Sequence, residues 1–410
     1  MSNLHLNKLL ICRNLLADKT FSMFIAAQAE PNNTALQYEF AATLLEKAEE
    51  LSLDGNLLKS YVIYLLTQNS NLAARTIELS NGHLSLSLQQ LFVHDMKILQ
   101  PFFKKQPSAF LSTDLLDDYQ PTRKRTSEPR QIVENAVRSD NTPESIAEAL
   151  LTYYRHYGYG DIASHRAFCW DNKKLRGIKY FDSTALKDII GYDKQKKQLI
   201  DNTVAFLSDK PANNVLLVGA RGTGKSSTVK ALANEYYGQG LRLLQITKPQ
   251  LVDLPIIMNE LRQYASKKFI IFLDDLSFED FEVEYKYLKS AIEGGVEVRP
   301  ENVLIYATSN RRHLIKETWR DREDGQDELY KNDSINETIS LSDRFGLIIN
   351  YRTPNQDEYL AIVDHYLRRS GIILSPEELR IAGHRWEIEH SGRSGRTARQ
   401  FVDYYLGHNK

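Results

Sequence analysis

One short segment constrains the fold more than any other part of the chain. Residues 214–228 read NVLLVGARGTGKSST, in which the apolar run 215–218 leads directly into the pattern G-x-x-x-x-G-K-S over 219–226. Between a strand and a helix, this pattern indicates a phosphate-binding loop. Glycines let the main chain curl so that several N–H groups face one anion, and the following helix presents its positive end to the same point. The alternative, a glycine-rich turn with a surface lysine, is disfavoured by the flanking strand and helix.

The side chains of this loop indicate which ligand it holds. We expect Lys225 to place a positive charge at the β- and γ-phosphates of a nucleotide, and the Ser226 hydroxyl to bind Mg²⁺ as a hard oxygen ligand. The predicted cofactors are therefore ATP and Mg²⁺, and the absence of a guanine-reading N-K-x-D sequence favours ATP over GTP. The predicted phosphate contacts are Gly219, Ala220, Arg221, Gly222, Thr223, Gly224, Lys225, Ser226 and Ser227.

The pattern around the loop predicts a parallel α/β sheet. Short β-branched runs alternate with helical patterns from residue 186 onward, and such alternation is typical of parallel sheets with helices between the strands. After Pro354 the pattern becomes helical to the end, which predicts a small C-terminal lid. The expected strands are 214–219, 241–247, 269–274, 302–308 and 346–351.

The N-terminal half has mainly helical periodicity, over residues 4–157. One amphipathic helix is expected over residues 1–24, and another is expected to start at Thr142, just ahead of a proline. The polar segment 117–130 contains two prolines and predicts a linker or an exposed loop. Since this half shows no catalytic or metal-ligand spacing, we expect a partner-binding or regulatory domain. The expected domains are a mainly helical one over 1–160, an α/β nucleotide-binding core over 161–354 and the lid over 355–410.

Composition places the chain among ordinary globular proteins. Hydrophobic residues make up 42% and charged residues 26%, and the formal net charge of -1 gives no global attraction to nucleic acid or to an anionic membrane. The two cysteines, Cys12 and Cys169, are too few for a disulfide framework or a cysteine metal cluster. No export signal and no apolar stretch of about 18 residues is evident, so the expected location is the cytoplasm and no membrane partner is expected.

A second candidate strand ends in acidic residues. Residues 267–276 read KKFIIFLDDL, and a buried parallel strand delivers its last residues to the sheet edge where ligands of open α/β folds bind. Asp274 is the predicted magnesium carboxylate there. Asp275 could polarise the attacking water, although many ATPases use the longer glutamate at that point, and Glu279 is a second candidate for the role. The alternative is a pair of acids that merely ends an edge strand.

The motifs that follow resemble those of AAA+ ATPases, in the same order. Residues 302–314, NVLIYATSNRRHL, resemble the sensor-1 strand, which implies that Asn310 orients the attacking water; an asparagine that caps a loop is the alternative. Residues 340–347, SLSDRFGL, resemble the arginine-finger box, which implies that Arg344 reaches the γ-phosphate of a neighbouring subunit. For this arginine, a structural ion pair with Asp343 is the alternative.

Two further segments resemble nucleotide-contacting parts of the same superfamily. SGRSGRTARQFV over 391–402 resembles sensor 2, which implies a contact from Arg396 to the nucleotide, with Arg393 and Arg399 as alternatives. LKDIIGY over 186–192 resembles the segment that packs on adenine, which implies contacts from Ile190 and Gly191; a helix cap that joins two domains is the alternative.

The combination of segments is narrower than the superfamily. Together with FLDDLSFE and YATSNRRHL, the segments above resemble a family of predicted AAA+ ATPases that is catalogued as a domain of unknown function, over about residues 150–405. In that family the double aspartate is usual, so the resemblance is compatible with an active enzyme. The fold class that it implies is an α/β P-loop NTPase core with a parallel sheet, a C-terminal helical lid and a mainly helical N-terminal domain.

Three functions are compatible with these features. The leading one is a ring- or oligomer-forming ATPase that couples Mg²⁺-dependent ATP hydrolysis to remodelling of a protein or nucleoprotein partner, because an arginine finger acts in trans. The second is a nucleic-acid-linked ATPase, such as a helicase loader or transposition helper. Its candidate contacts would be Arg123, Lys124, Arg125, Arg311, Arg312, His313 and the lid arginines, although small basic clusters are more typical of a solvated face. The third is a slow or non-hydrolysing nucleotide switch. The acid-rich segment 317–337 is expected to be an exposed insertion.

Overall fold

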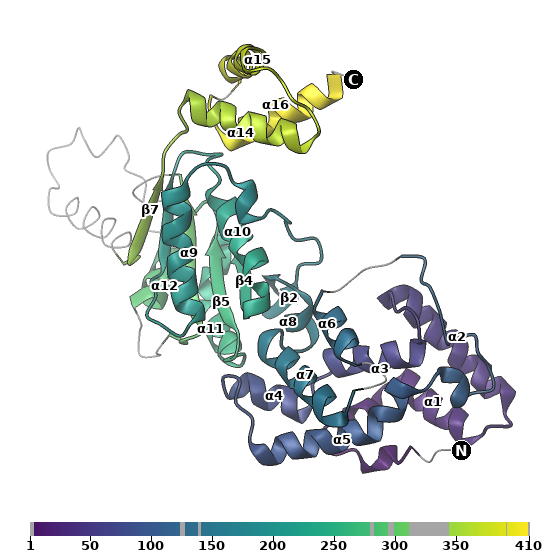
Figure 1. Ribbon diagram of the computed structural model, residues 1–410. Helices are drawn as coiled ribbons and strands as arrows, with labels where there is room; N and C mark the ends of the chain where they lie inside the picture. The colour runs from purple at the N-terminus through teal and green to yellow at the C-terminus, as the bar shows by residue number, and fades with distance from the viewer. Residues whose placement is uncertain are drawn as a thin grey trace. The chain divides into compact units, whose positions relative to one another are not determined.

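The computed structural model describes residues 4–123, 128–137, 141–278, 283–293, 299–310, 344–390 and 392–408. The chain divides into two compact units (Figure 1). The first runs to His165 and includes the two short segments Gly238–Gly240 and Gln263–Lys267, and the second comprises the remainder. Within the described parts, none of the helices combines the length and the apolar character needed to cross a membrane.

The first unit is built from helices, as the periodicity predicts. Its core is aromatic, and Phe21, Phe24, Phe40 and Phe102 are all fully buried. Thr142 begins helix α7 as predicted, because its hydroxyl accepts a hydrogen bond from the Ser145 N–H at 3.2 Å. The elements are η1 (Leu6–Lys8), η2 (Arg13–Ala17), α1 (Lys19–Ala29), α2 (Thr34–Leu51), α3 (Leu57–Gln68), α4 (Leu72–Leu79), α5 (Leu86–Lys104), η3 (Pro107–Ala109), α6 (Glu128–Ala136), α7 (Pro143–His156) and α8 (Gly160–Ser164).

The single helix expected over residues 1–24 is wrong. The segment instead forms η1, η2 and the start of α1. The reason is a fully buried carboxylate, that of Asp95, which accepts hydrogen bonds from the main-chain N–H groups of Leu10, Ile11 and Cys12. Those N–H groups are then directed to a distant side chain instead of a helical carbonyl, and Asp18 caps a new helix by accepting from the Phe21 N–H at 2.8 Å.

The expected linker over residues 117–130 is wrong at its C-terminal end. Helix α6 already begins at Glu128, and Pro129 fits its second position because the first helical N–H groups need no partner within the helix. Arg130 then donates hydrogen bonds to the main-chain oxygens of Leu51 and Ser52 at the end of α2. The Arg130 side chain thus caps the C-terminal end of α2 and is not part of an exposed linker.

The second unit contains a seven-stranded sheet in the order β2-β1-β4-β5-β6-β3-β7. All neighbouring strands are parallel except the hairpin β1–β2. The five strands predicted from the sequence are confirmed, and the hairpin was not predicted. The strands are β1 (Ala167–Asp171), β2 (Lys174–Gly177), β3 (Val215–Gly219), β4 (Leu241–Ile246), β5 (Lys268–Leu273), β6 (Val303–Ser309) and β7 (Leu347–Tyr351).

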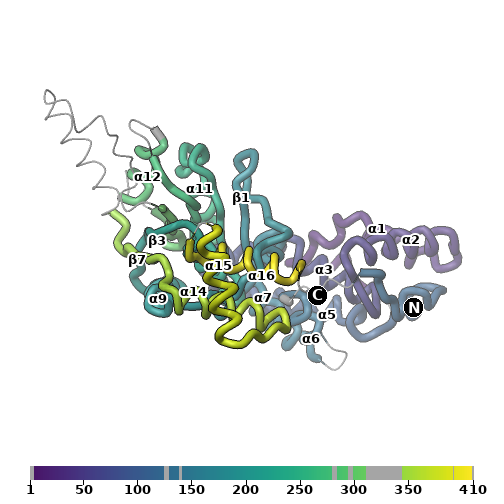
Figure 2. Tube along the Cα trace, turned by 90° about the horizontal axis from the view of Figure 1, so that it is seen from above, coloured from purple at the N-terminus to yellow at the C-terminus, as the bar shows by residue number. Residues whose placement is uncertain are grey.

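Helices cover both faces of this sheet (Figures 1 and 2). Helices α9 (Asp193–Leu207) and α10 (Lys225–Glu235) pack on one face, where Leu199 and Leu232 join the strand residues in one buried cluster. Helices α11 (Leu254–Arg262) and α12 (Val283–Glu293) lie on the other face. Burial on both faces explains why the strands are almost continuously apolar. Shorter elements of this unit are η4 (Leu186–Asp188), η5 (Tyr237–Gln239) and η6 (Lys248–Asp253).

Three helices after the last strand form the lid, with a hydrophobic core of its own. They are α14 (Gln356–Arg369), α15 (Pro376–Glu389) and α16 (Gly395–His408), and α14 and α16 lie close together (Figure 1). Tyr359, Leu367 and Phe401 are among the buried residues of this core. The predicted fold class is therefore confirmed in its architecture: a mostly parallel α/β core that carries the phosphate loop, with a C-terminal helical lid and a mainly helical N-terminal part.

Candidate functional site

A cavity of about 700 Å³ lies where the carboxyl ends of β3, β5 and β6 meet the lid. Its volume falls in the range of small-molecule and cofactor sites. Its lining comes from the phosphate loop, from the ends of β5 and β6, from residues before α9 and from the lid. The lining residues are Asp182, Thr184, Ile189, Ile190, Tyr192, Arg221, Gly222, Thr223, Gly224, Lys225, Ser226, Ser227, Lys230, Asp274, Asp275, Thr308, Asn310, Ile362, Tyr366, Gly395, Arg396 and Arg399.

The phosphate loop curls as the sequence predicts. Gly222 and Gly224 have φ values of 76° and 87°, in the left-handed region that favours glycine, and Gly224 immediately precedes α10. The Lys225 ammonium is largely buried and donates hydrogen bonds to the main-chain oxygens of Gly219 and Ala220, both at 2.7 Å. Gly219 and Ala220 do not line the cavity themselves, so in this conformation they orient Lys225.

Charges around Lys225 partly offset the effect of its burial. Burial lowers the pKa of the ammonium group, while the nearby carboxylates of Asp275 and Asp274 act in the opposite direction. Arg221 adds a second cation, and its guanidinium lies 3.9 Å from the Asp275 carboxylate. This end of the cavity therefore combines cations, curled main chain and acids, a combination suited to a magnesium-bound phosphate chain.

The two residues predicted to hold magnesium lie in direct contact. The Ser226 hydroxyl donates a hydrogen bond to Asp274 Oδ1 at 2.5 Å, although the two residues are far apart in the sequence. A serine hydroxyl and a carboxylate are hard oxygen ligands, which fit Mg²⁺. The described residues contain no group of three or more His, Cys, Asp and Glu side chains that could hold a metal ion unaided. The two protein oxygen ligands that are present, from Ser226 and Asp274, fit a Mg²⁺ ion that keeps water ligands and shares phosphate oxygens with a nucleotide.

Asp275 and Asn310 are also brought together. The Asn310 side-chain amide donates a hydrogen bond to the Asp275 carboxylate, and its Oδ1 atom lies 3.4 Å from the Lys225 ammonium. Asp275 has a φ of 55°, in the left-handed region that aspartate tolerates better than most residues. The two side chains predicted to place the attacking water thus form one connected group beside the phosphate loop.

Residues of the lid also line the cavity. Arg396 and Arg399, near the start of α16, both line it, whereas Arg393 forms an ion pair with Glu387 within the lid at 2.9 Å. The structure therefore places two of the three candidate lid arginines at the cavity. The main-chain N–H of Gly395 donates a hydrogen bond to the Gly222 oxygen at 2.9 Å, so the lid also contacts the phosphate loop directly.

Part of the cavity lining is apolar. Ile190 lines the cavity together with Ile189, Ile362 and Tyr366, and Ile190 also packs against the core of the lid. Gly191, the neighbouring predicted contact, does not line the cavity. Its φ of 76° shapes the turn that precedes α9. This apolar lining suits the base of a nucleotide.

Arg344 lies elsewhere. It does not line the cavity, and its guanidinium forms an ion pair with Glu293 at the end of α12. The alternative partner considered from the sequence, Asp343, lies outside the described residues. So do Glu279, the basic residues Lys124, Arg125, Arg311, Arg312 and His313, and the segment 317–337.

Several cavity residues escaped the sequence analysis. The most informative is Thr308, which lies on β6 two residues before Asn310, the residue that directly follows the strand, and two residues is the period at which side chains return to one side of an extended chain. That period of two was the signal available in the sequence. Asp182 and Lys230 were also missed, and both line the cavity together with Arg399, which the sequence analysis named as an alternative lid arginine. Burial raises the pKa of Asp182, but hydrogen bonds from Thr184 and the charges of both cations leave it below its ordinary value.

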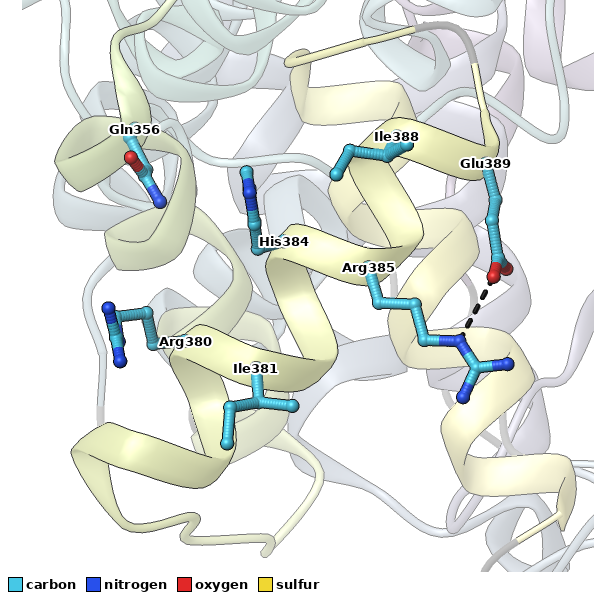
Figure 3. A pocket seen from close by; sticks show the side chains of 7 residues that line it. All are labelled: Gln356, Arg380, Ile381, His384, Arg385, Ile388 and Glu389. Atoms are coloured by element: carbon cyan, nitrogen blue, oxygen red, sulfur yellow. Dashed lines mark hydrogen bonds and ion pairs between the residues drawn. The ribbon is translucent and has the colours of Figure 1, made fainter.

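A second cavity, of about 460 Å³, lies on the lid alone (Figure 3). Helix α15 supplies most of its lining, including the exposed side chains of Ile381 and Ile388. Arg385 and Glu389 at its rim form an ion pair at 3.0 Å. No residue of the phosphate loop or of the acidic strand end lines this cavity, so its chemistry is separate from that of the candidate nucleotide site.

Comparisons with solved structures found similarity to the RuvB Holliday junction branch migration motor of Thermotoga maritima, at 17% sequence identity and a TM-score of 0.39. The match covers 54% of this chain and 64% of that chain. Two mutants of the same protein match at 18% identity and a TM-score of 0.39, over 54% of this chain and 64% and 65% of theirs. The chain thus spans slightly less than two thirds of these solved chains. Among curated proteins no match was found.

A family model matches residues 163–409, a span that contains all seven strands of the sheet, every residue that lines the larger cavity and the described part of the lid. The match confirms the resemblance that the phosphate loop, the acidic strand end and the YATSNRRHL segment indicate. The chain belongs to the family described as "Protein of unknown function (DUF815)".

Proposed function

We propose that the chain is an AAA+-type ATPase that binds ATP with Mg²⁺ in the cavity between the sheet and the lid. One observation carries this proposal: the phosphate loop, the Ser226–Asp274 pair and the Asp275–Asn310 pair line one cavity. These groups come from three separate parts of the sequence. Their convergence supports a binding site, because a merely structural glycine turn would not require acids and an amide from two other strands.

Each side chain has a separate task in this proposal. The loop N–H groups and Lys225 hold the phosphates, and Arg396 contacts them from the lid. Ser226 and Asp274 would hold Mg²⁺, which when bound neutralises charge on the phosphate oxygens. Asp275 orients the attacking water and accepts its proton, and Asn310 fixes the Asp275 carboxylate through the hydrogen bond described above.

The remaining task, stabilising charge on the transferred phosphoryl group, falls to an arginine from a neighbouring subunit. Arg344 lies outside its own chain's cavity, which is the arrangement that a residue acting in trans requires. We therefore propose that the active form is a ring or another oligomer. Hydrolysis in such an assembly would drive the remodelling of a protein or nucleoprotein partner.

The pairing of Arg344 with Glu293 also favours a second candidate function. If that ion pair persists in solution, hydrolysis would be very slow and bound ATP would act as a switch that orders the lid against the core. The two functions share the same binding site. They differ only in whether turnover follows binding.

The binding step is tested by titrating the full chain with ATP and Mg²⁺ in a calorimeter. Lys225→Met keeps the aliphatic stem but removes the charge, so we expect an affinity loss of about 10- to 100-fold, the size of a lost charge-assisted hydrogen bond. Lys268→Met is the matched control, because Lys268 is also buried but lies at the start of β5, outside the cavity. Equal affinities for the wild type and Lys225→Met would contradict the proposal.

A further inference from the structure

We propose that Thr308 is a positioning residue for the magnesium site, and that its hydroxyl fixes both acidic residues at the end of β5. This inference rests on the proposed function. It concerns a residue that no sequence motif singled out, and it follows from two hydrogen bonds made by one buried oxygen atom.

The first bond acts on the magnesium carboxylate. Thr308 Oγ1 donates to Asp274 Oδ1 at 2.7 Å. Ser226 donates to the same oxygen, but a serine that binds a cation through its hydroxyl oxygen must redirect its proton. Thr308 is only 2% exposed and has no such second task, so its bond can hold the carboxylate in one orientation before and after the cation arrives. Partners of this kind tune metal affinity through the ligand that they orient.

The second bond acts on the main chain of the next residue. The Asp275 N–H donates to Thr308 Oγ1 at 2.9 Å. Asp275 has a left-handed backbone conformation, so an external partner for its N–H helps to select that conformation over others. The Leu276 N–H donates to the main-chain oxygen of Thr308 at 2.7 Å. That last bond does not involve the side chain, so a substitution at position 308 tests the hydroxyl while the main-chain connection remains.

The Thr308 hydroxyl therefore acts as a hydrogen-bond donor and as an acceptor at the same time. A threonine hydroxyl has one proton and two lone pairs, and here the proton goes to Asp274 while a lone pair receives the Asp275 N–H. Valine has the same shape but can make neither bond. Serine can make both. Comparing the valine and serine variants therefore separates the effect of the hydroxyl group from the effect of side-chain shape.

The test measures binding of a non-hydrolysable ATP analogue to the full chain by calorimetry, first in EDTA and then over a series of Mg²⁺ concentrations. For Thr308→Val we expect unchanged affinity for the analogue in EDTA. The Mg²⁺ midpoint, defined as the Mg²⁺ concentration that gives half of the metal-dependent gain in affinity for the analogue, should rise by about 10- to 100-fold. Thr308→Ser should restore the wild-type midpoint. No turnover is needed for this readout, so it does not depend on the rate of hydrolysis.

Thr203→Val is the matched control. Thr203 is also fully buried in the second unit, and its hydroxyl also makes two hydrogen bonds, to the Leu199 oxygen at 2.8 Å and to the Tyr306 hydroxyl at 2.9 Å, but it lies outside the cavity. We expect Thr203→Val to lower the melting temperature and leave the Mg²⁺ midpoint unchanged.

A wild-type Mg²⁺ midpoint in Thr308→Val would overturn the proposal and reduce Thr308 to a structural residue. If the valine variant does not fold, Thr308→Cys replaces it, since a thiol is only a weak donor and should give a midpoint between those of serine and valine. A wild-type midpoint in the cysteine variant would then count against the proposal. If the wild type itself binds no nucleotide in EDTA or in Mg²⁺, the proposed function fails, and this inference fails with it.

Discussion

At the scale of single residues, the end of β5 combines chemistry with an unusual backbone. Asp275 has a φ of 55° and also accepts a hydrogen bond from Asn310 and faces the Arg221 guanidinium. A residue that combines a strained backbone conformation with a charged side chain is typical of functional positions. The side chain of aspartate is shorter than that of glutamate. The left-handed backbone of Asp275, however, directs its side chain differently from that of a residue in extended conformation. The shorter side chain of Asp275 therefore does not by itself argue against its role as the general base.

Asp275→Asn tests that role. Asparagine tolerates the left-handed region about as well as aspartate, so we expect an unchanged melting temperature. Without the carboxylate, ATP turnover should fall by about 10²- to 10⁴-fold, the usual contribution of a general base, while ATP binding persists. The measurement is phosphate release under saturating ATP and Mg²⁺.

A second substitution at this position separates backbone from chemistry. Asp275→Ala should lose turnover and also stability, by about 1–2 kcal/mol, because alanine is disfavoured in the left-handed region. If Asp275→Asn hydrolyses ATP at the wild-type rate, the base must be another residue. If the wild type itself binds ATP without turnover, the switch function is the better description.

At the scale of elements, the phosphate loop and helix α16 are in contact through Gly222. A side chain at this position would place its Cβ atom 2.8 Å from the Ser394 hydroxyl oxygen and 2.9 Å from the Ser394 Cβ atom. Ser394 in turn begins α16, because its hydroxyl accepts the Thr397 N–H at 3.0 Å. The phosphate loop and the lid thus pack so closely at position 222 that only glycine fits there.

Gly222→Ala should therefore weaken ATP binding through the position of the lid. An overpacking cost of about 1–3 kcal/mol corresponds to an affinity loss of about 10-fold or more, measured by calorimetry. Gly371→Ala is the matched control, since Gly371 has a similar φ of 79° but no atom within 4 Å of an added Cβ atom. It introduces the same backbone strain without the steric clash.

The double variant Gly222→Ala with Ser394→Gly removes the two nearest crowding atoms and leaves the Arg396 Cβ atom at 3.2 Å. It should recover most of the lost affinity, with a residual deficit from the left-handed alanine and from the lost cap. If Gly222→Ala and Gly371→Ala lower the melting temperature equally and neither changes ATP affinity, the contact between loop and lid has no part in binding.

At the scale of the whole molecule, the position of Arg344 bears on assembly. The residue pairs with Glu293 in its own chain, and the carboxylate is partly exposed, so the ion pair is worth little and can open when a better partner arrives. A polyanionic phosphate chain in a neighbouring subunit is such a partner. We therefore expect nucleotide-dependent association, observable as a mass increase when ATP and Mg²⁺ are added.

Arg344→Ala should bind ATP about as well as the wild type and lose about 10³-fold or more in turnover, the effect of removing an arginine finger. Glu293→Gln is the matched control, because it breaks the same ion pair but keeps the guanidinium, and it should retain turnover. Mixing Arg344→Ala with Lys225→Met should restore part of the activity, since an assembly then contains sites with both groups intact. A mixture that stays inactive while both variants assemble would argue against action in trans.

How much of this could be predicted from the sequence differs between the fold and the site. The phosphate loop and the five parallel strands were predictable, because their signals are local: a fixed glycine spacing and short apolar runs bounded by breakers. The hairpin β1–β2 was missed. Its two-residue turn at Asn172 and Lys173 has positive φ at both positions, and only the asparagine is a recognisable signal for that turn.

The amino-acid sequence alone shows which segments offer main-chain N–H donors, cations and carboxylates, because residue type and neighbouring pattern fix the charge and the donors of each segment. Which residues of those segments come into contact depends on the folded chain. The contacts of Thr308 with Asp274, of Gly222 with the lid and of Arg344 with Glu293 join positions far apart in the chain. Such contacts depend on strand order and helix packing, and no local pattern encodes them.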